Sequence, residues 1–223
     1  MFRLTLSTGL ILAIIVAAAV YLLLNYNRSS ACTVLQTIPL ADSVNVEIVG
    51  TDCQEGLPHT TDSKTIRMTQ SIWEGPRRDA VLAHERVHLA QKSNVSAAEW
   101  RRFYERAWGY KCYSKPPSDV PAEFVARLRP NPDTADSPWA LWRNRWLFFP
   151  AFNAEGSLRG AEVIVWDIEN HRQVMPPAEW RDEFCGKEGC PHQYEHPHEI
   201  SAEWLAARSV KCPAAEKLFA WQK

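Results

Sequence analysis

An uncharged apolar segment near the amino terminus, Leu4–Leu24, constrains most what this chain can fold into. At a rise of ~1.5 Å per residue, a helix of this length reaches across the roughly 30 Å hydrocarbon core of a bilayer. A cleavable signal peptide usually has a shorter apolar core and a small-residue cleavage site, whereas this run ends in Leu22–Asn25. We therefore expect an uncleaved signal anchor, one membrane-spanning helix followed by a polar linker, in residues 1–31.

Two alternatives remain for this end of the chain. One is a cleaved signal peptide, and the other is a lipoprotein, because Ser29–Cys32 loosely matches a bacterial lipoprotein cleavage box. The amino group and Arg3 before the span carry slightly more positive charge than Arg28 after it, which favours a cytoplasmic amino terminus. The rest of the chain is then predicted to lie outside the cytoplasm, in a periplasm, in a lumen or at a cell surface.

The cysteines agree with this orientation, because all six follow the apolar segment: Cys32, Cys53, Cys112, Cys185, Cys190 and Cys212. An even number of cysteines in a translocated domain is most simply explained by disulfides, so we expect three bridges. Cys185 and Cys190 are close enough in sequence to close a local loop. Their alternative use, a metal knuckle with His192, suits a cytosolic protein better.

The composition favours one globular domain in residues 32–223. The chain has 223 residues, 46% of them hydrophobic, which is enough for one core of ordinary size. Its formal net charge of -1 provides no basic surface for a nucleic-acid backbone, so nucleic-acid partners are not expected. The 10 tryptophans are assigned mainly to core packing.

Hydrophobic periodicity predicts an α+β fold. Apolar residues that alternate or run together indicate strands at Val44–Val49, Thr65–Trp73, Trp146–Phe152 and Glu162–Ile168, the last two as a hairpin. Helical spacing and end signals predict four helices. Three of them cover Arg78–Lys92, Ala122–Leu128 and Pro197–Arg208. The other begins at a capping box formed by Ser96 and Glu99 and ends near Gly109. The segment Ser114–Pro138, rich in proline, serine and aspartate, is expected to cross the surface beside the cleft.

One predicted helix contains the sequence His84-Glu85-Arg86-Val87-His88. Residues four apart lie on the same helix face, so both imidazoles can bind one metal ion. Glu85 emerges beside them, where its carboxylate can take a proton from a metal-bound water without being a ligand. The competing interpretation is a pair of structural histidines with satisfied hydrogen bonds.

This motif resembles the HExxH motif of the zincin metallopeptidases, and the resemblance covers little beyond the motif helix. It implies an α+β zincin-like domain with an active-site helix and a small sheet, a bound Zn²⁺ and a peptide or protein substrate. The metzincin branch is excluded as a model for the third ligand, because Gln91 and Asn94 replace its glycine and third histidine.

The gluzincin branch takes its third ligand from a glutamate on a later helix, often with an acidic residue four positions on. Glu199 and Glu203 match that arrangement, which implies that Glu199 binds the metal and that Glu203 orients a histidine. Other possible third ligands are Glu105, Glu195, His196 and His198. Acidic residues at a helix start also need no function, since they suit the positive helix end.

A site of two histidines and one glutamate leaves the fourth zinc position open to water, as in catalytic zinc sites. The function expected from the resemblance is therefore zinc-dependent peptide-bond hydrolysis by a membrane-anchored enzyme, with Glu85 as the general base. Possible oxyanion donors, close in sequence to Glu199, are Tyr194, His196 and His198. The alternative is a non-catalytic, disulfide-stabilised adhesion or assembly module in which further protein ligands close the zinc site.

Overall fold

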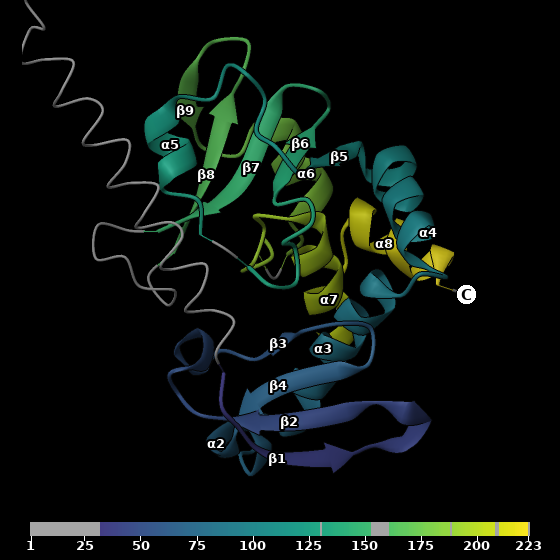
Figure 1. The fold of residues 1–223 in the computed structure, drawn as a ribbon. Helices are drawn as coiled ribbons and strands as arrows, with labels where there is room; N and C mark the ends of the chain where they lie inside the picture. Colours follow the sequence, from purple (N-terminus) through teal and green to yellow (C-terminus); the bar gives the residue numbers. More distant parts are fainter. Residues whose placement is uncertain (1–31, 130, 153–160, 188, 208–209, 223) are drawn as a thin grey trace, which may run out of the picture.

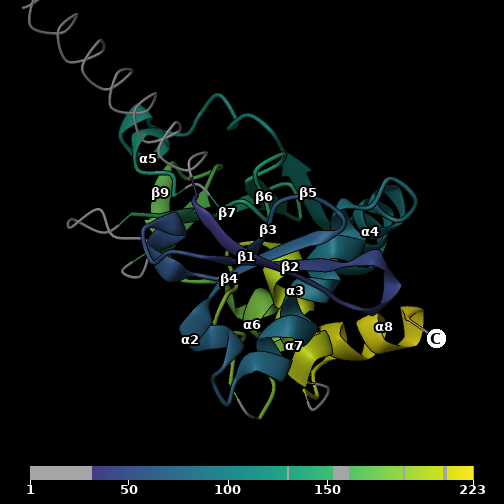
Figure 2. The same ribbon diagram turned by 60° about the horizontal axis from the view of Figure 1, so that its bottom comes forward.

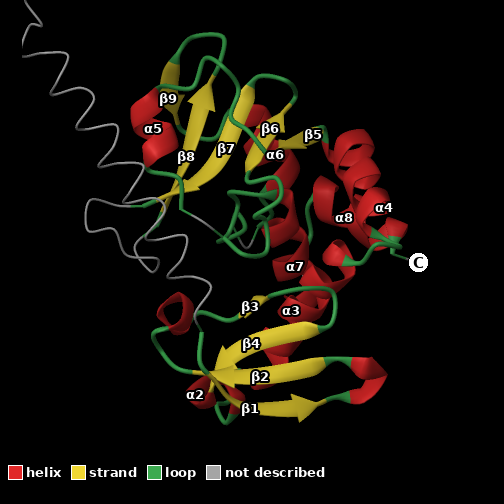
Figure 3. Ribbon diagram, in the orientation of Figure 1, coloured by secondary structure: helices red, strands yellow, loops and turns green. Residues whose placement is uncertain are grey.

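The computed structural model describes residues 32–222 except 130, 153–160, 188 and 208–209. The expected membrane span, Leu4–Leu24, lies outside these residues. None of the helices within the described part is long and apolar enough to cross a membrane. The described chain has an α+β fold with two separate sheets, which Figure 3 shows in yellow at opposite ends of the molecule.

The first sheet has the strand order β1-β2-β4-β3. Its members are β1 (Val34–Pro39), β2 (Asn45–Val49), β3 (His59–Thr60) and β4 (Thr65–Thr69). Only β2 and β4 are parallel, and β1 and β3 flank them in antiparallel pairs. Every second residue of β2 and β4 is buried where their apolar side chains alternate with polar ones, as expected for a sheet with one covered face.

The second sheet is an antiparallel meander with the order β5-β6-β7-β8-β9. Its strands are β5 (Tyr110–Tyr113), β6 (Trp139–Trp142), β7 (Trp146–Ala151), β8 (Glu162–Asp167) and β9 (Arg172–Val174). All of β6 and nearly all of β7 is buried, so this sheet is covered on both faces. Its two sides belong to different hydrophobic clusters, one of which includes Trp139 and Phe149 and the other Trp142 and Phe148.

Two contacting helices, α3 (Arg78–Lys92) and α7 (Pro197–Ala207), lie between the sheets (Figure 1). Helix α3 covers the first sheet, where Leu89 packs with Val46 and Ile66. Helix α8 (Pro213–Trp221) contacts α7. Figure 2 shows α3, α7 and α8 grouped together in the lower half of the view. The remaining helices are α2 (Gln70–Trp73), α4 (Ala97–Phe103), α5 (Ala122–Ala126), α6 (Ala178–Phe184), the short η1 (Ala41–Ser43) and η2 (Cys53–Gly56), and the π-helical η3 (Tyr104–Trp108).

Aromatic side chains form the main core between the helices and the second sheet. Five tryptophans are fully buried: Trp108, Trp142, Trp180 and Trp204 belong to this core, and Trp139 belongs to the cluster on the other face of the second sheet. Their burial confirms the assignment of this residue type to packing. Their ring nitrogens find partners where the core is deepest: Trp108 donates to the carbonyl of Ala214, and Trp180 donates to the Tyr110 hydroxyl. Each large aromatic ring buries 150–250 Å² of surface, so this cluster dominates the hydrophobic stabilisation.

The structure confirms most of the predicted elements and corrects two of them. The segment Thr65–Trp73 is a strand only to Thr69, after which the chain turns into α2. The capping box at Ser96 is not formed, because the Ser96 hydroxyl bonds to the carbonyl of Ala90 instead. Strands β1, β3, β5, β6 and β9 and helices α2, α6 and α8 were not predicted.

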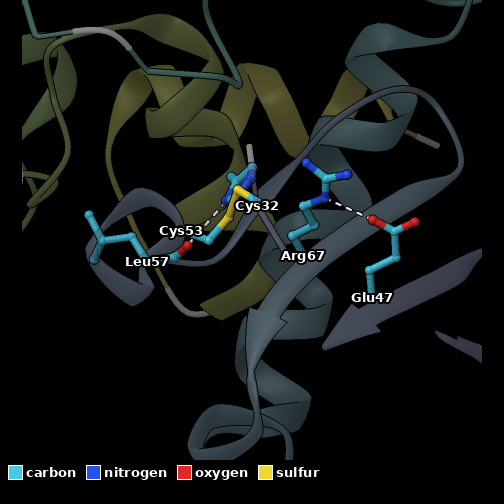
Figure 4. Close-up of a disulfide and its surroundings, with 6 residues drawn as sticks. Cys32, Glu47, Cys53, Leu57 and Arg67 are labelled. Atoms are coloured by element: carbon cyan, nitrogen blue, oxygen red, sulfur yellow. Dashed lines mark hydrogen bonds and ion pairs between the residues drawn. A yellow bond between two sulfur atoms is a disulfide. The ribbon is translucent and has the colours of Figure 1, made fainter. Parts of the chain in front are cut away.

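Two disulfides join four of the six cysteines. One bridge, Cys32–Cys53, ties the start of the described chain to η2 (Figure 4), and the other, Cys185–Cys190, closes the predicted local loop. The expected third bridge is wrong: Cys112 on β5 and Cys212 at the start of α8 are both unpaired. Both remaining thiols pack against the aromatic core, where a cysteine serves as a small apolar side chain.

Candidate metal centre

Three ligand atoms meet where α3 faces α7. The Nε2 atoms of His84 and His88 lie 3.1 Å apart, and Oε2 of Glu199 lies 3.3 Å from each of them. The two histidines are one helical turn apart on α3, and Glu199 lies in the first turn of α7. His88 and Glu199 are 1% and 2% exposed and His84 is 18% exposed, so the group is open on the His84 side.

This triangle has the size of one face of a coordination tetrahedron. Two nitrogen or oxygen ligands at 2.0–2.1 Å from a zinc ion, separated by the tetrahedral angle, are about 3.3 Å apart. The three observed separations of 3.1–3.3 Å match this value. Each residue presents an atom with a lone pair toward the same point, so the group fits a divalent cation that accepts nitrogen and oxygen ligands.

A neighbouring side chain fixes the orientation of His88. The Nδ1 of His88 lies 2.7 Å from Oε1 of Gln91, one turn further along α3. The amide nitrogen of Gln91 in turn donates to the hydroxyls of Tyr104 and Ser201, at 3.0 and 2.9 Å. Since the amide oxygen can only accept, Nδ1 of His88 carries a proton, and Nε2 is the ring nitrogen that could bind a metal once its own proton is displaced.

The carboxylate of Glu199 is held in a similar way. Its Oε1 accepts a hydrogen bond of 2.7 Å from Nδ2 of Asn131, which leaves Oε2 directed at the two histidines. Asn131 is itself held by its own Oδ1, which accepts from the backbone nitrogen of Asp133. Asn131 and Asp133 belong to the segment Ser114–Pro138, which lines the cleft as expected, but both side chains are buried and not at the surface.

Burial and the facing charges act in opposite directions on these groups. Burial lowers the pKa of His88, but the carboxylates of Glu199 and Asp133 outweigh burial and raise it to about 10. Burial raises the pKa of Glu199, yet the charge of His88 and the hydrogen bonds from both imidazoles hold that pKa well below its usual range. In the absence of a metal, the pair is therefore stabilised as a carboxylate and an imidazolium, and a cation bound between them would take the place of that proton.

Glu85 lies beside the triangle without belonging to it. Its side chain is 2% exposed, and its Oε2 has no hydrogen-bond partner within the described chain. Burial, followed by the negative charge of Asp133, raises the pKa of Glu85 well above its usual range. A buried carboxyl group with an open acceptor position is suited to exchange a proton with a molecule in the cleft.

The predicted oxyanion donors are placed differently from one another. His196 bonds through Nε2 to the carbonyl of Ser137, at 3.0 Å, and its Nδ1 accepts from the backbone nitrogen of His198, so both ring nitrogens are used. His198 lies 3.3 Å through Nδ1 from the carbonyl of Asp133. Tyr194 packs its ring against Trp180 in the aromatic core. None of these three side chains lines the cavity beside the triangle.

The alternative third ligands lie outside the triangle. Glu105 is on η3 with a side chain that is 57% exposed and lies 3.9 Å from Lys111. Glu195 is buried, and burial followed by the charge of Glu199 raises its pKa to about 7, a rise that the charge of Arg129 opposes. Of the proposed residues, Glu199 is the one whose carboxylate meets both histidines.

The bracing role expected for Glu203 is taken by other residues. Its carboxylate accepts from the backbone nitrogens of His192 and Gln193, at 2.9 and 3.2 Å, and it pairs with the His192 ring. The side chain that orients a ligand imidazole is Gln91. Its position three residues after His88 is a signal that the sequence contained, because residues i and i+3 are neighbours on a helix. Asn131 gives no such local signal.

A cavity of about 400 Å³ opens onto the triangle. Its wall includes His84, Glu85 and Glu199, together with Asn131 and Asp133 from the surface crossing. Val81 and Ala80 continue the wall along α3 toward its amino-terminal end. The cavity therefore gives a small molecule or a chain segment access to the ligand atoms and to Glu85 at once.

Comparisons with known proteins add nothing to this geometry. No protein-family model, curated protein or solved structure matches the chain. The zincin resemblance therefore depends on His84, Glu85 and His88 and on the position of Glu199 beside them.

Proposed function

We propose that this protein is a zinc-dependent peptidase of the zincin type that uses His84, His88 and Glu199 as metal ligands and Glu85 as general base. The observation that supports this most is the triangle of ligand atoms, whose 3.1–3.3 Å separations fit one face of a zinc tetrahedron. A zinc ion held there would supply a Lewis acid with an open position for water or a carbonyl oxygen.

The residues around the triangle have complementary tasks in this proposal. Gln91 and Asn131 orient His88 and Glu199, so that the ligand atoms are positioned before any ion binds. Glu85 accepts a proton from the attacking water through its open Oε2 and passes it to the leaving nitrogen. The cavity admits the substrate on the side where His84 is exposed.

The competing proposal, a zinc site with a purely structural role, needs a fourth protein ligand. The nearest additional histidines, His196 and His198, are tethered to the carbonyls of Ser137 and Asp133. Neither imidazole belongs to the group of ligand atoms around His84 and His88. This arrangement favours the open, catalytic type of site.

The decisive experiment replaces Glu85 by glutamine, which keeps the shape of the side chain but removes the base. Full-length wild type and Glu85→Gln are compared on a mixed peptide library, and the zinc content is measured on the same samples. We expect the variant to retain zinc and to lose hydrolysis by at least roughly 10²–10⁴-fold. A wild type that binds zinc but cleaves no peptide would move the assignment to the structural-zinc module. A His84→Ala, His88→Ala double variant with unchanged zinc content would refute the metal site itself.

A further inference from the structure

A second hollow of about 530 Å³ adjoins the metal cavity. The two share the wall residues Leu57, Pro58, Arg77 and Val81, so they lie next to each other along the amino-terminal half of α3, and we call the two together the trough. From Arg77 to His84 this helix rises roughly 10 Å, at ~1.5 Å per residue. An extended peptide advances ~3.3 Å per residue, so about three residues cover that distance.

The rim of the trough is fixed to the body of the protein. Leu57 and Pro58 follow η2, which the Cys32–Cys53 bridge anchors, and Leu57 lies next to that bridge in Figure 4. The Nδ1 of the His59 ring lies 3.1 Å from the carbonyl of Leu57 and restrains the same turn. A wall with these restraints is preformed and loses little entropy when a ligand binds.

The neighbouring edge of the first sheet is closed at Thr60 of β3. The backbone nitrogen of Thr60 donates to Oδ1 of Asp133 at 3.0 Å, and its carbonyl accepts from Nζ of Lys92 at 2.7 Å. An edge strand binds an extended peptide through free backbone groups, and those of Thr60 already have partners. The trough over Leu57 and Pro58 is therefore the better path for a chain that leaves the metal cavity.

Arg77 gives this path its chemical character. It is the only charged residue among those that line the second hollow, whose other wall residues are apolar or carry hydroxyls. Arg77 is exposed and has no ion pair or hydrogen-bond partner for its side chain within the described residues. The other arginine of the metal cavity, Arg129, does not line the second hollow, and its positive charge opposes the rise in the pKa of Glu195.

We propose that the trough binds a peptide and that Arg77 recognises a carboxylate about three residues from the bond at the metal site. A guanidinium matches a carboxylate with two parallel hydrogen bonds, which gives both affinity and a fixed register. The carboxylate comes from an acidic side chain or from the carboxyl terminus of the peptide. Peptide binding by the trough does not depend on the proposed hydrolysis. Only the spacing between the carboxylate and the scissile bond rests on that proposed function.

Arg78 provides a matched control. It is adjacent in sequence and is paired with Asp79 at 2.9 Å, and it lines neither hollow. Arg77→Gln and Arg78→Gln change the net charge equally. Full-length wild type and both variants are compared by the sites they cleave in a peptide library. We expect wild type to favour Asp, Glu or a free carboxyl terminus at one fixed position, Arg77→Gln to lose that preference by roughly 10-fold, and Arg78→Gln to retain it.

A binding measurement makes the result independent of catalysis. Fluorescein-labelled heptapeptides with one Asp, with Asn in its place, or with an amidated carboxyl terminus are titrated against full-length Glu85→Gln protein with and without Arg77→Gln. Weaker binding of the Asn peptide identifies a side-chain carboxylate, and weaker binding of the amide identifies the terminal one. Equal affinities for all peptides, unchanged by Arg77→Gln, would overturn the proposal. Arg77-dependent binding in this assay, combined with no cleavage of the peptide library by wild type, would instead refute hydrolysis and leave peptide binding in the trough supported.

Discussion

At the scale of single residues, the amide of Gln91 occupies a position where a carboxylate often supports a metal-binding histidine. A neutral amide fixes the proton on Nδ1 of His88 without adding negative charge beneath it. Gln91 in turn is held by Tyr104 and Ser201, so the orientation of one ligand depends on three buried side chains. A carboxylate at this position would add negative charge through the histidine and make a bound ion a weaker electrophile. The neutral amide of Gln91 would weaken it less.

Replacing Gln91 by leucine tests its role in metal binding. Leucine removes the acceptor for Nδ1, and we expect zinc affinity to fall roughly 10–100-fold in a competitive chelator titration. Glu203→Gln is the control, because Glu203 lies on the same cavity wall but bonds to His192 and Gln193. A larger loss in Glu203→Gln than in Gln91→Leu would return the bracing role to Glu203.

At the scale of elements, a buried ion pair joins three segments that surround the site. Nζ of Lys92, at the end of α3, lies 3.0 Å from Oδ1 of Asp133 in the surface crossing. The same carboxylate accepts hydrogen bonds from the backbone and hydroxyl of Thr60 on β3. Asp133 thus holds the segment Ser114–Pro138 against α3 and the first sheet. The same contacts position Asn131, whose Oδ1 accepts from the backbone nitrogen of Asp133.

Lys92→Met breaks this connection while leaving the carboxylate of Asp133 buried. Because an unpaired buried charge is costly, we expect the free energy of unfolding to fall by about 3–5 kcal/mol in urea denaturation. Arg67→Met provides the comparison, because the carboxylate of its partner Glu47 is 22% exposed whereas that of Asp133 is 6% exposed. The pair of Arg67 with Glu47 (Figure 4) should contribute about 0–1 kcal/mol. Equal decreases in the free energy of unfolding in the two variants would show that the pair of Lys92 with Asp133 stabilises the fold no more than the pair of Arg67 with Glu47.

The turn after β8 predicts a pH dependence of stability. Asp167 accepts hydrogen bonds from Arg145 and Asn170, which hold the pKa of its carboxyl well below the usual range. A carboxyl group with a lowered pKa stabilises the fold above its unfolded-state pKa of about 3.9 and loses that contribution as the pH falls further. Asp167→Asn should therefore be less stable than wild type at pH 7 and show a smaller loss between about pH 5 and about pH 2. Parallel stability curves for the two proteins would contradict this assignment.

At the scale of the whole molecule, α7 connects the two halves of the site. Helix α7 contacts α3 on one side and α8 on the other, so Glu199 is positioned by the same packing that forms the aromatic core. Ile200 and Trp204 of α7 are fully buried in that core. Any change that loosens the core should therefore also move a metal ligand.

The disulfides give a prediction at this scale. The two cysteines of the Cys32–Cys53 bridge are separated by 21 positions in the sequence, and those of the Cys185–Cys190 bridge by 5 positions. Loop-closure entropy predicts stabilisation of about 3 and about 2 kcal/mol, so Cys32→Ala, Cys53→Ala should lower the melting temperature more than the other double variant. Thiol titration of unfolded, unreduced protein from its native source should find two free thiols, those of Cys112 and Cys212. Finding six would refute both bridges.

Those features that depend on neighbours along the chain could be predicted from the sequence. Helical spacing placed His84, Glu85 and His88 on one face of a helix whose predicted ends, Arg78 and Lys92, agree with the structure. The hairpin of β7 and β8 and the start of α7 at Pro197 followed from equally local patterns.

The distant residues that complete the site became known from the packing of the helices and not from the sequence. The meeting of Glu199 with His84 and His88 depends on how α7 packs on α3, and the positions of Asn131 and Asp133 depend on long-range contacts to Glu199 and Thr60. The Ser96 hydroxyl bonds to the carbonyl of Ala90 in the preceding helix instead of capping its own helix. The third bridge was expected from the even number of cysteines, but Cys112 and Cys212 pack separately against the aromatic core. Hydrophobic periodicity in the sequence specifies on which face of a helix or strand a side chain lies. The packing of the folded chain specifies which other residues that face contacts.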